Sequence, residues 1–190
     1  SSVQYICFLS FLFKLRYEPK SSKKIAQMYQ RKVLICNIIL ALTAMGNVLE
    51  NSDLIFAAKT LREAVDGVMR KEGGPFGALI VRDGEIITTG NNQVLLTGDP
   101  TAHAEIVAIR RACLILKRHQ LEDCIIYSSC EPCPMCLGAI YWTRFKKLIY
   151  SATREDAANA GFDDSYIYRQ IELSRDQREI ETIYLPVSES

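Results

Sequence analysis

The residues best suited to chemistry are three cysteines in the stretch SSCEPCPMC, where Cys130, Cys133 and Cys136 recur at every third position. Thiols at this spacing serve as redox pairs, as ligands of iron–sulfur clusters or zinc, or as ordinary buried residues. A ferredoxin-type run would continue to a fourth cysteine at position 140, which is Ile140. Cys130 is therefore interpreted as a small residue at a strand end without a metal bond, and the other two cysteines as the acting pair.

A histidine and a glutamate in the stretch TAHAE complete a candidate metal site. Pro134 suits the first position of a helix, which places Cys133 and Cys136 at a helix N-terminus, where the helix dipole favours the thiolate. His103 lies near the start of another predicted helix, capped by the residues just before it. Together these side chains supply three of the about four ligands of a zinc ion, and an open fourth position is typical of a catalytic site. Glu105 is near enough to partner an activated water.

The order of these residues resembles the signature of the zinc-dependent nucleobase deaminases: His-x-Glu, a gap of 26 residues, then Pro-Cys-x-x-Cys. The resemblance implies Zn²⁺ as the cofactor, with His103, Cys133 and Cys136 as its ligands. It also implies that Glu105 is the catalytic acid and base rather than a ligand.

From Gly73 to about Ile180 the chain is similar to the bacterial guanine deaminases of the cytidine deaminase superfamily. The similarity lies in GGPFGALIV, GNNQV, DPTAHAEI, SSCEPCPMCLGAIYWTR and AGFDDSYIY. The last stretch indicates the guanine branch, where the aspartate matching Asp164 contacts the N–H edge of the purine, and a carboxylate suits adjacent donors. The alternative for this aspartate is a surface position at a helix start. The resemblance further implies substrate contacts by Phe76, Asn92 and the backbone N–H of Ala104, and support of the metal-binding loop by Glu131 and Pro132.

The reaction that the resemblance implies is the hydrolysis of guanine to xanthine and ammonia, in purine catabolism or salvage. Glu105 would move protons between water, the ring nitrogen and the leaving amine. Three alternatives stay open: a tRNA adenosine deaminase, a guanosine or cytosine deaminase, and a zinc-binding module without turnover.

The elements that must position these residues alternate between helix and strand. Apolar residues at helical spacing follow Ser52, a candidate N-cap, and the pair Gly73-Gly74 is predicted to end that helix. GALIV and EIITTG flank Asp83-Gly84 and predict a β-hairpin. The stretch NNQVLLTGDP after the hairpin is predicted to be a loop. Further helices are predicted at about 100–118, 134–142, 153–160 and 164–172, and further strands at 124–129, 147–152 and 182–187. This alternation predicts a sheet covered on both faces, and the resemblance implies a three-layer α/β/α cytidine-deaminase-like fold with a mixed central sheet.

Residues 1–48 differ from the rest and are interpreted as an N-terminal extension, with the deaminase domain at 49–190. The run 33–49 holds 17 residues without a charge, which is the low end for a membrane span and also resembles a signal-peptide layout. The favoured interpretation is an extra helix or sequence outside the functional domain. The family members are dimers, so the resemblance implies a homodimer. The C-terminus looks short beside the family, whose members often exchange a closing tail between subunits, and loss of that tail would weaken an exchanged dimer.

Charge and cysteine content restrict the partners and the compartment. Residues 1–48 hold seven Lys or Arg and one acid, a net charge of +6, and residues 49–190 hold 16 against 21, a net charge of −5. An acidic body disfavours a nucleic-acid substrate and favours a small molecule. Seven cysteines, four of them between positions 124 and 136, indicate a reducing compartment, so we expect a cytoplasmic protein.

Overall fold

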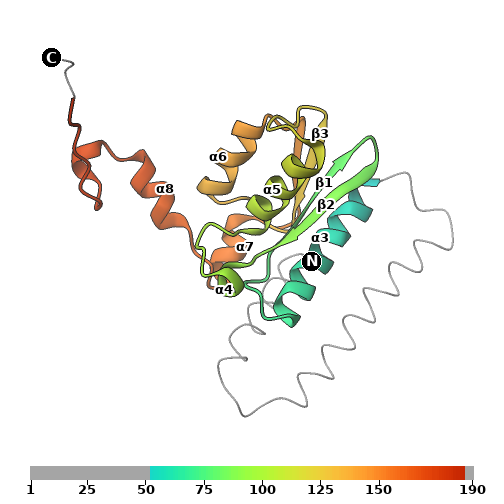
Figure 1. Ribbon diagram of the computed structural model, residues 1–190. Helices are drawn as coiled ribbons and strands as arrows, with labels where there is room; N and C mark the ends of the chain where they lie inside the picture. Colours follow the sequence, from blue (N-terminus) through green and yellow to red (C-terminus); the bar gives the residue numbers. More distant parts are fainter. Residues whose placement is uncertain (1–51, 187–190) are drawn as a thin grey trace, which may run out of the picture.

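A computed structural model describes residues 52–186, in which a four-stranded sheet of order β2-β1-β3-β4 lies between helices (Figure 1). The predicted extension 1–48 and the apolar run 33–49 lie outside the described residues. In chain order the elements are α3 (Ser52–Met69), β1 (Gly77–Arg82), β2 (Glu85–Asn91), α4 (Val94–Thr97), α5 (Ala104–Leu116), β3 (Cys124–Ser128), α6 (Pro134–Thr143), β4 (Lys147–Tyr150), α7 (Arg154–Asn159), α8 (Ser165–Glu172) and the 3₁₀ turn η1 (Arg175–Gln177).

The sheet is mixed, as predicted. Strand β1 pairs antiparallel with both β2 and β3, and β3 pairs in parallel with β4. The predicted hairpin is confirmed, because Arg82 pairs with Glu85 across a two-residue turn. Both turn residues, Asp83 and Gly84, have positive φ angles of 51° and 80°, which is the conformation of a type I′ hairpin turn.

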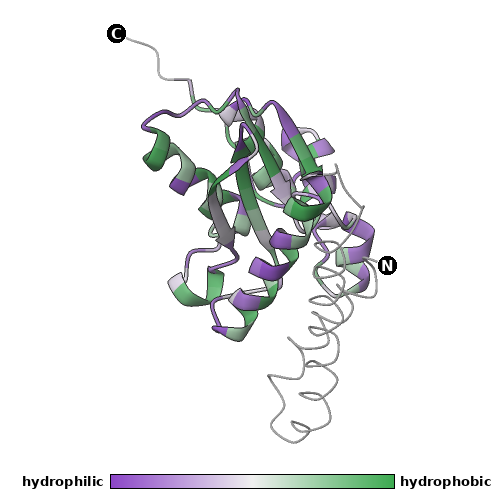
Figure 2. Ribbon diagram, turned by 90° about the vertical axis from the view of Figure 1, so that its right-hand side faces the viewer, coloured by the Kyte–Doolittle hydropathy of each residue, from purple (hydrophilic) through white to green (hydrophobic). Residues whose placement is uncertain are grey.

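Alternating residues of the central strands divide the core into two layers. Ala78, Ile80 and Ile126 pack on the side of α5 and α6. Leu79 and Tyr127 pack against Phe56 of α3 on the opposite face. Figure 2 shows hydrophobic residues in the central strands, whereas the surrounding helices carry both hydrophobic and hydrophilic residues. The three-layer α/β/α prediction is therefore confirmed.

Helix α5 packs closely on the sheet because small residues meet at the contact. Ala104, Ala108 and Ala112 recur every fourth position and are completely buried. Opposite them, β2 presents Gly90, where an added Cβ would lie 2.5 Å from the Ala104 carbonyl oxygen and 2.8 Å from the Ala108 nitrogen. Glycine is required there because any side chain would collide with helix backbone.

Several predicted boundaries are wrong in ways that have local causes. Helix α3 ends at Met69 rather than at the glycine pair, and Lys71 turns the chain with a φ of 65°. Helix α5 begins at Ala104 rather than near Pro100, because the Asp99 carboxylate instead accepts hydrogen bonds from the N–H and hydroxyl of Thr101.

Two further expectations fail in the loop and tail regions. The stretch NNQVLLTGDP was expected to be a loop, but it contains the single helical turn α4, which Gly98 closes with a φ of 69°. The strand predicted at 182–187 is absent from its described part, residues 182–186, where large apolar side chains such as Ile183 and Tyr184 are exposed.

Helix α8 extends away from the sheet and its covering helices (Figure 1). Its contact with the body includes Arg154 of α7, whose guanidinium lies 4.9 Å from the centre of the Tyr168 ring. Between Ser52 and the end of the described chain, no helix has the length and hydrophobicity that crossing a membrane requires.

Candidate metal centre and active site

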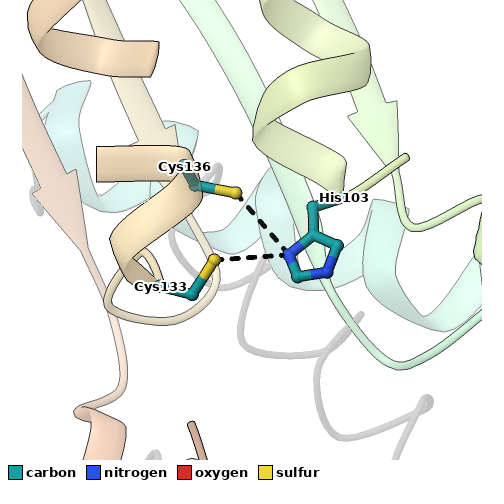
Figure 3. A group of neighbouring side chains, drawn as sticks. All are labelled: His103, Cys133 and Cys136. Carbon is teal, nitrogen blue, oxygen red and sulfur yellow. Dashed lines mark hydrogen bonds between the residues drawn. The ribbon is translucent and has the colours of Figure 1, made fainter. Parts of the chain in front are cut away.

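The predicted metal ligands come together where two helices begin. His103 is the N-cap of α5 and Cys133 is the N-cap of α6, and both have extended backbones with ψ angles of 158° and 167°. Cys136 lies one turn into α6. The His103 Nδ1 atom is 3.5 Å from the Cys133 sulfur and 3.6 Å from the Cys136 sulfur (Figure 3). Helix N-termini attract negative charge, which suits thiolates.

The spacing and chemistry of this donor set fit a zinc ion. A zinc–nitrogen bond of about 2.05 Å and a zinc–sulfur bond of about 2.3 Å at the tetrahedral angle place nitrogen and sulfur about 3.6 Å apart. The two observed nitrogen–sulfur distances match that value, and all three donor atoms lie within 4.8 Å of one another. An imidazole with two sulfurs leaves one tetrahedral position for another ligand. When bound there, zinc lowers the pKa of a coordinated water.

The two cysteines differ in proton affinity because they share a hydrogen bond. The pKa of Cys133 is lowered to about 4, because Cys136 donates a hydrogen bond to its sulfur and His103 adds another. That same bond, together with burial, raises the pKa of Cys136. The lowered pKa of Cys133 favours its thiolate, the form that binds metal, whereas the raised pKa of Cys136 means that metal binding must displace its proton.

Glu105 occupies the second position of α5 and lies beside this cluster. Its side chain is buried, and burial raises the pKa of its carboxyl group. Oε1 accepts a hydrogen bond from the Ser128 hydroxyl at 2.8 Å, and Oε2 lies 3.5 Å from the Cys136 sulfur. A raised pKa makes the carboxylate a stronger base toward a proton of water, which suits a general base.

A cavity of about 410 Å³ opens over this cluster and reaches most of the predicted substrate contacts. Phe76, Asn92 and Asp164 line it together with His103 and Glu105. Ala104 is not among its lining residues, although its N–H belongs to the first turn of α5, where backbone donors have no intrahelical acceptor.

The Asn92 carboxamide is held in a fixed orientation at the cavity wall. Its Oδ1 accepts hydrogen bonds from the backbone N–H groups of Gly74 at 3.1 Å and Val94 at 3.2 Å. Because both bonds occupy the oxygen, the Nδ2 amide group is the part that faces an incoming acceptor. Gly73 has no room for a side chain, since a Cβ would overlap the Asn92 side chain and carbonyl.

Asp164 lies across the cavity, at the N-cap of α8, where its side chain makes no capping hydrogen bond. Burial, followed by the nearby Cys133 charge, raises the pKa of its carboxyl group. The neighbouring Asp163 is different, because its Oδ1 accepts a hydrogen bond from the Ser165 N–H at 2.9 Å. Asp164 is therefore the aspartate of the pair whose carboxylate stays available to a ligand.

The supporting residues predicted in the metal-binding loop connect that loop to α7. The Glu131 carboxylate accepts a hydrogen bond from the Arg154 backbone N–H at 3.1 Å, and Pro132 is buried. Cys130 is also buried, two residues beyond β3, and its sulfur lies 3.5 Å from the Thr153 carbonyl oxygen. Burial raises the pKa of Cys130 to about 12, so it stays a thiol outside the metal cluster.

Three residues of the site were not predicted from the sequence. Phe162 packs edge-on against Phe76 with ring centres 5.1 Å apart, and Arg154 reaches the cavity from α7. Ser128 was quoted within the cysteine stretch without a function. Strand periodicity could have found it, because Cys124, Ile126 and Ser128 share the face of β3 that α5 covers.

The fold and the site together define a hydrolytic deaminase. The fold is a four-stranded α/β/α sandwich, and the site combines a histidine and two cysteines at two helix N-termini with a buried glutamate beside them. The family described as cytidine and deoxycytidylate deaminase zinc-binding region matches residues 50–152. The chain belongs to this family.

Individual relatives show where in the family the similarity is strong. Guanine deaminase of Bacillus subtilis is 56% identical over 125 residues, which cover 66% of this chain and 80% of that protein. The X-ray structure of guanine deaminase from Bacillus subtilis superimposes with a TM-score of 0.69 at 52% identity, covering 70% of this chain and 85% of that one. A tRNA-specific adenosine deaminase of Aquifex aeolicus is 45% identical over 97 residues, covering 51% of this chain and 64% of the relative.

Proposed function

We propose that this protein catalyses the zinc-dependent hydrolysis of guanine to xanthine and ammonia. The observation that carries the proposal is the convergence of Glu105, the His103/Cys133/Cys136 cluster and Asp164 on one cavity. The similarity to a guanine deaminase, described above, extends over more of the chain than the similarity to the tRNA deaminase.

The cavity walls suit the hydrogen-bonding pattern of guanine. Guanine presents a ring N–H and an amino group side by side, and a carboxylate such as Asp164 accepts from such donors. Its carbonyl oxygen and imidazole nitrogen are acceptors, which the Asn92 amide group and the Ala104 N–H can serve. The edge-to-face pair of Phe76 and Phe162 supplies an aromatic wall for the flat base.

Proton transfer is assigned to Glu105. It removes a proton from the attacking water as the new carbon–oxygen bond forms at the carbon bearing the amino group. It passes that proton to the ring nitrogen and then carries the second proton, taken from the new hydroxyl group, to the departing amine, so that ammonia leaves as the carbon–nitrogen bond breaks and the carbonyl forms. One water enters and one ammonia departs for each xanthine formed.

Charge at the cavity favours a free base over a polyanion. Four acidic residues line the cavity, Glu105, Glu131, Asp163 and Asp164. Against them stands one guanidinium, that of Arg154, which is already paired with Glu155. Phosphate groups of a nucleotide or tRNA would meet net negative charge there. The tRNA deaminase alternative is therefore disfavoured on electrostatic grounds.

A homodimer and a cytoplasmic location are part of the same proposal. Exposed apolar side chains on α5 and α6, including Leu114 at 78% and Trp142 at 82% exposure, offer a surface for a second copy. All five cysteines of residues 52–186 are free thiols, which fits a reducing compartment.

A substrate panel tests the proposed reaction directly. Ammonia release is measured with guanine, guanosine, cytosine, adenine and tRNA under identical conditions, on the full chain and on a chain without residues 1–48. We expect guanine to give the highest kcat/KM. Turnover of tRNA with none of guanine would instead support the adenosine-editing alternative.

Exchanging the carboxylate of Asp164 tests how the base is recognised. Asp164→Asn replaces an acceptor with an amide donor that faces the donors of guanine. A hydrogen bond to a charged group contributes about 1.5–3 kcal/mol, so kcat/KM for guanine should fall about 10- to 10²-fold. Asp163→Asn is the matched control, since the Asp163 carboxylate accepts a hydrogen bond from the Ser165 backbone N–H. An equal loss of kcat/KM in the two variants would contradict the assignment of Asp164.

A further inference from the structure

The two oxygens of the Glu105 carboxyl group have different neighbours. Oε1 accepts the 2.8 Å hydrogen bond of the Ser128 hydroxyl, and Oε2 faces the Cys136 sulfur at 3.5 Å. Both Ser128 and Glu105 are almost fully buried, with exposures of 2% and 5%. Water therefore does not compete for this bond, and the hydroxyl is the neighbour that distinguishes one oxygen from the other.

The backbone of Ser128 is fixed on both sides. It is the last residue of β3, a central strand, where it pairs with Ala78 of β1 and with Tyr150 of β4. Its carbonyl oxygen also accepts a hydrogen bond from the Ser151 N–H at 3.3 Å. Among the described residues, the Glu105 carboxylate is the acceptor of its hydroxyl, so the hydroxyl proton points toward Oε1.

This arrangement matters because the terminal torsion of a glutamate is otherwise loosely determined. We propose that Ser128 is the positioning residue of Glu105, holding Oε1 so that Oε2 faces the metal cluster. The inference rests on the proposed function of Glu105 in deamination.

The position of Ser128 predicts a specific kinetic pattern. Ser128 is not among the lining residues of the cavity, so losing its hydroxyl should not weaken substrate binding. Misplacing a reacting group by about 1 Å costs up to about 10²-fold in rate. Removal of the hydroxyl should therefore lower kcat about 10- to 10²-fold and leave KM within about 2-fold. A defect in substrate binding would instead raise KM.

Ser128→Thr and Ser128→Val are the decisive pair, because their side chains have nearly the same shape and only threonine keeps the hydroxyl. We expect Ser128→Thr to retain kcat within about 3-fold and Ser128→Val to show the loss. Ser128→Ala repeats the test without the added methyl group. Melting temperature and zinc content identify any variant that fails to fold. Equal kcat values in the threonine and valine variants, or a rise in KM alone, would overturn the proposal.

Crystal structures of the zinc-loaded threonine and valine variants provide a readout independent of turnover. The Glu105 carboxyl group should keep its orientation in Ser128→Thr and rotate or become disordered in Ser128→Val, and an unchanged orientation in both would refute the positioning role. This measurement stands even if wild-type protein deaminates no guanine. In that case the substrate proposal fails, and the Ser128 proposal is judged on the carboxyl orientation.

Discussion

Glu105→Gln is expected to bind zinc like wild type and to lose most of its guanine deamination. Glutamine preserves the shape of the side chain and an acceptor for the Ser128 hydroxyl, but it cannot take a proton from water. General acid–base catalysis contributes about 10²–10⁴-fold, so kcat should fall by about that factor or more. Ammonia release measures the loss, and elemental analysis should still find about one zinc per chain.

Glu105→Ala provides the second arm of this test. It removes the carboxyl group entirely and should be as inactive as the glutamine variant. Since Glu105 is buried, a fall in melting temperature is expected from the alanine change alone. A glutamine variant that keeps kcat within about 10-fold of wild type would show that another group moves the proton.

Removing the metal is expected to abolish activity reversibly. Chelation, or Cys133→Ser, should lower guanine deamination by more than about 10²-fold, because the Lewis acid contributes several kcal/mol. Added Zn²⁺ should restore the chelated wild type. Zinc content and ammonia release are measured on the same samples, so that metal loss and rate loss can be compared directly.

Cys130→Ala is the matched control for metal content. Cys130 belongs to the same cysteine run, but its sulfur lies against the Thr153 carbonyl oxygen. It should therefore retain zinc, whereas Cys133→Ser should not. Loss of zinc from both variants would contradict a His103/Cys133/Cys136 site, and loss from neither would place the metal elsewhere.

The cysteine pair could be placed at a helix start because its signals are local in sequence, whereas His103, 30 positions from Cys133, was joined to the pair through the resemblance to the deaminase signature. Pro134 marks a helix start, so it fixes Cys133 as the N-cap and Cys136 one turn later. Likewise, Asp83-Gly84 determines a hairpin through the turn conformation that it favours. Each of these signals lies within a few residues of the structure that it specifies.

The remainder depended either on competition between local contacts or on contacts that are remote in sequence. Helix α5 begins at Ala104 instead of near Pro100, because the Asp99 carboxylate accepts a hydrogen bond from Thr101 and does not cap the helix. Both partners are equally near in sequence, so the sequence alone does not decide between them. The Ser128–Glu105 bond joins residues 23 positions apart, and only the packing of α5 on the sheet brings them together. The exposed segment 182–186 has a strand-like composition but no neighbouring strand to pair with among the described residues.

Strand β2 influences the site through Gly90, because this glycine lets the start of α5 lie directly against the strand. His103 and Glu105 belong to the same first turn of α5 that rests on this glycine. A methyl group at position 90 would push the start of α5 away from the strand. His103 and Glu105 would move together, whereas the two cysteine sulfurs at the start of α6 would keep their positions. The absence of a Cβ atom at position 90 therefore helps to set the distance between the α5 residues and the α6 cysteines of the site.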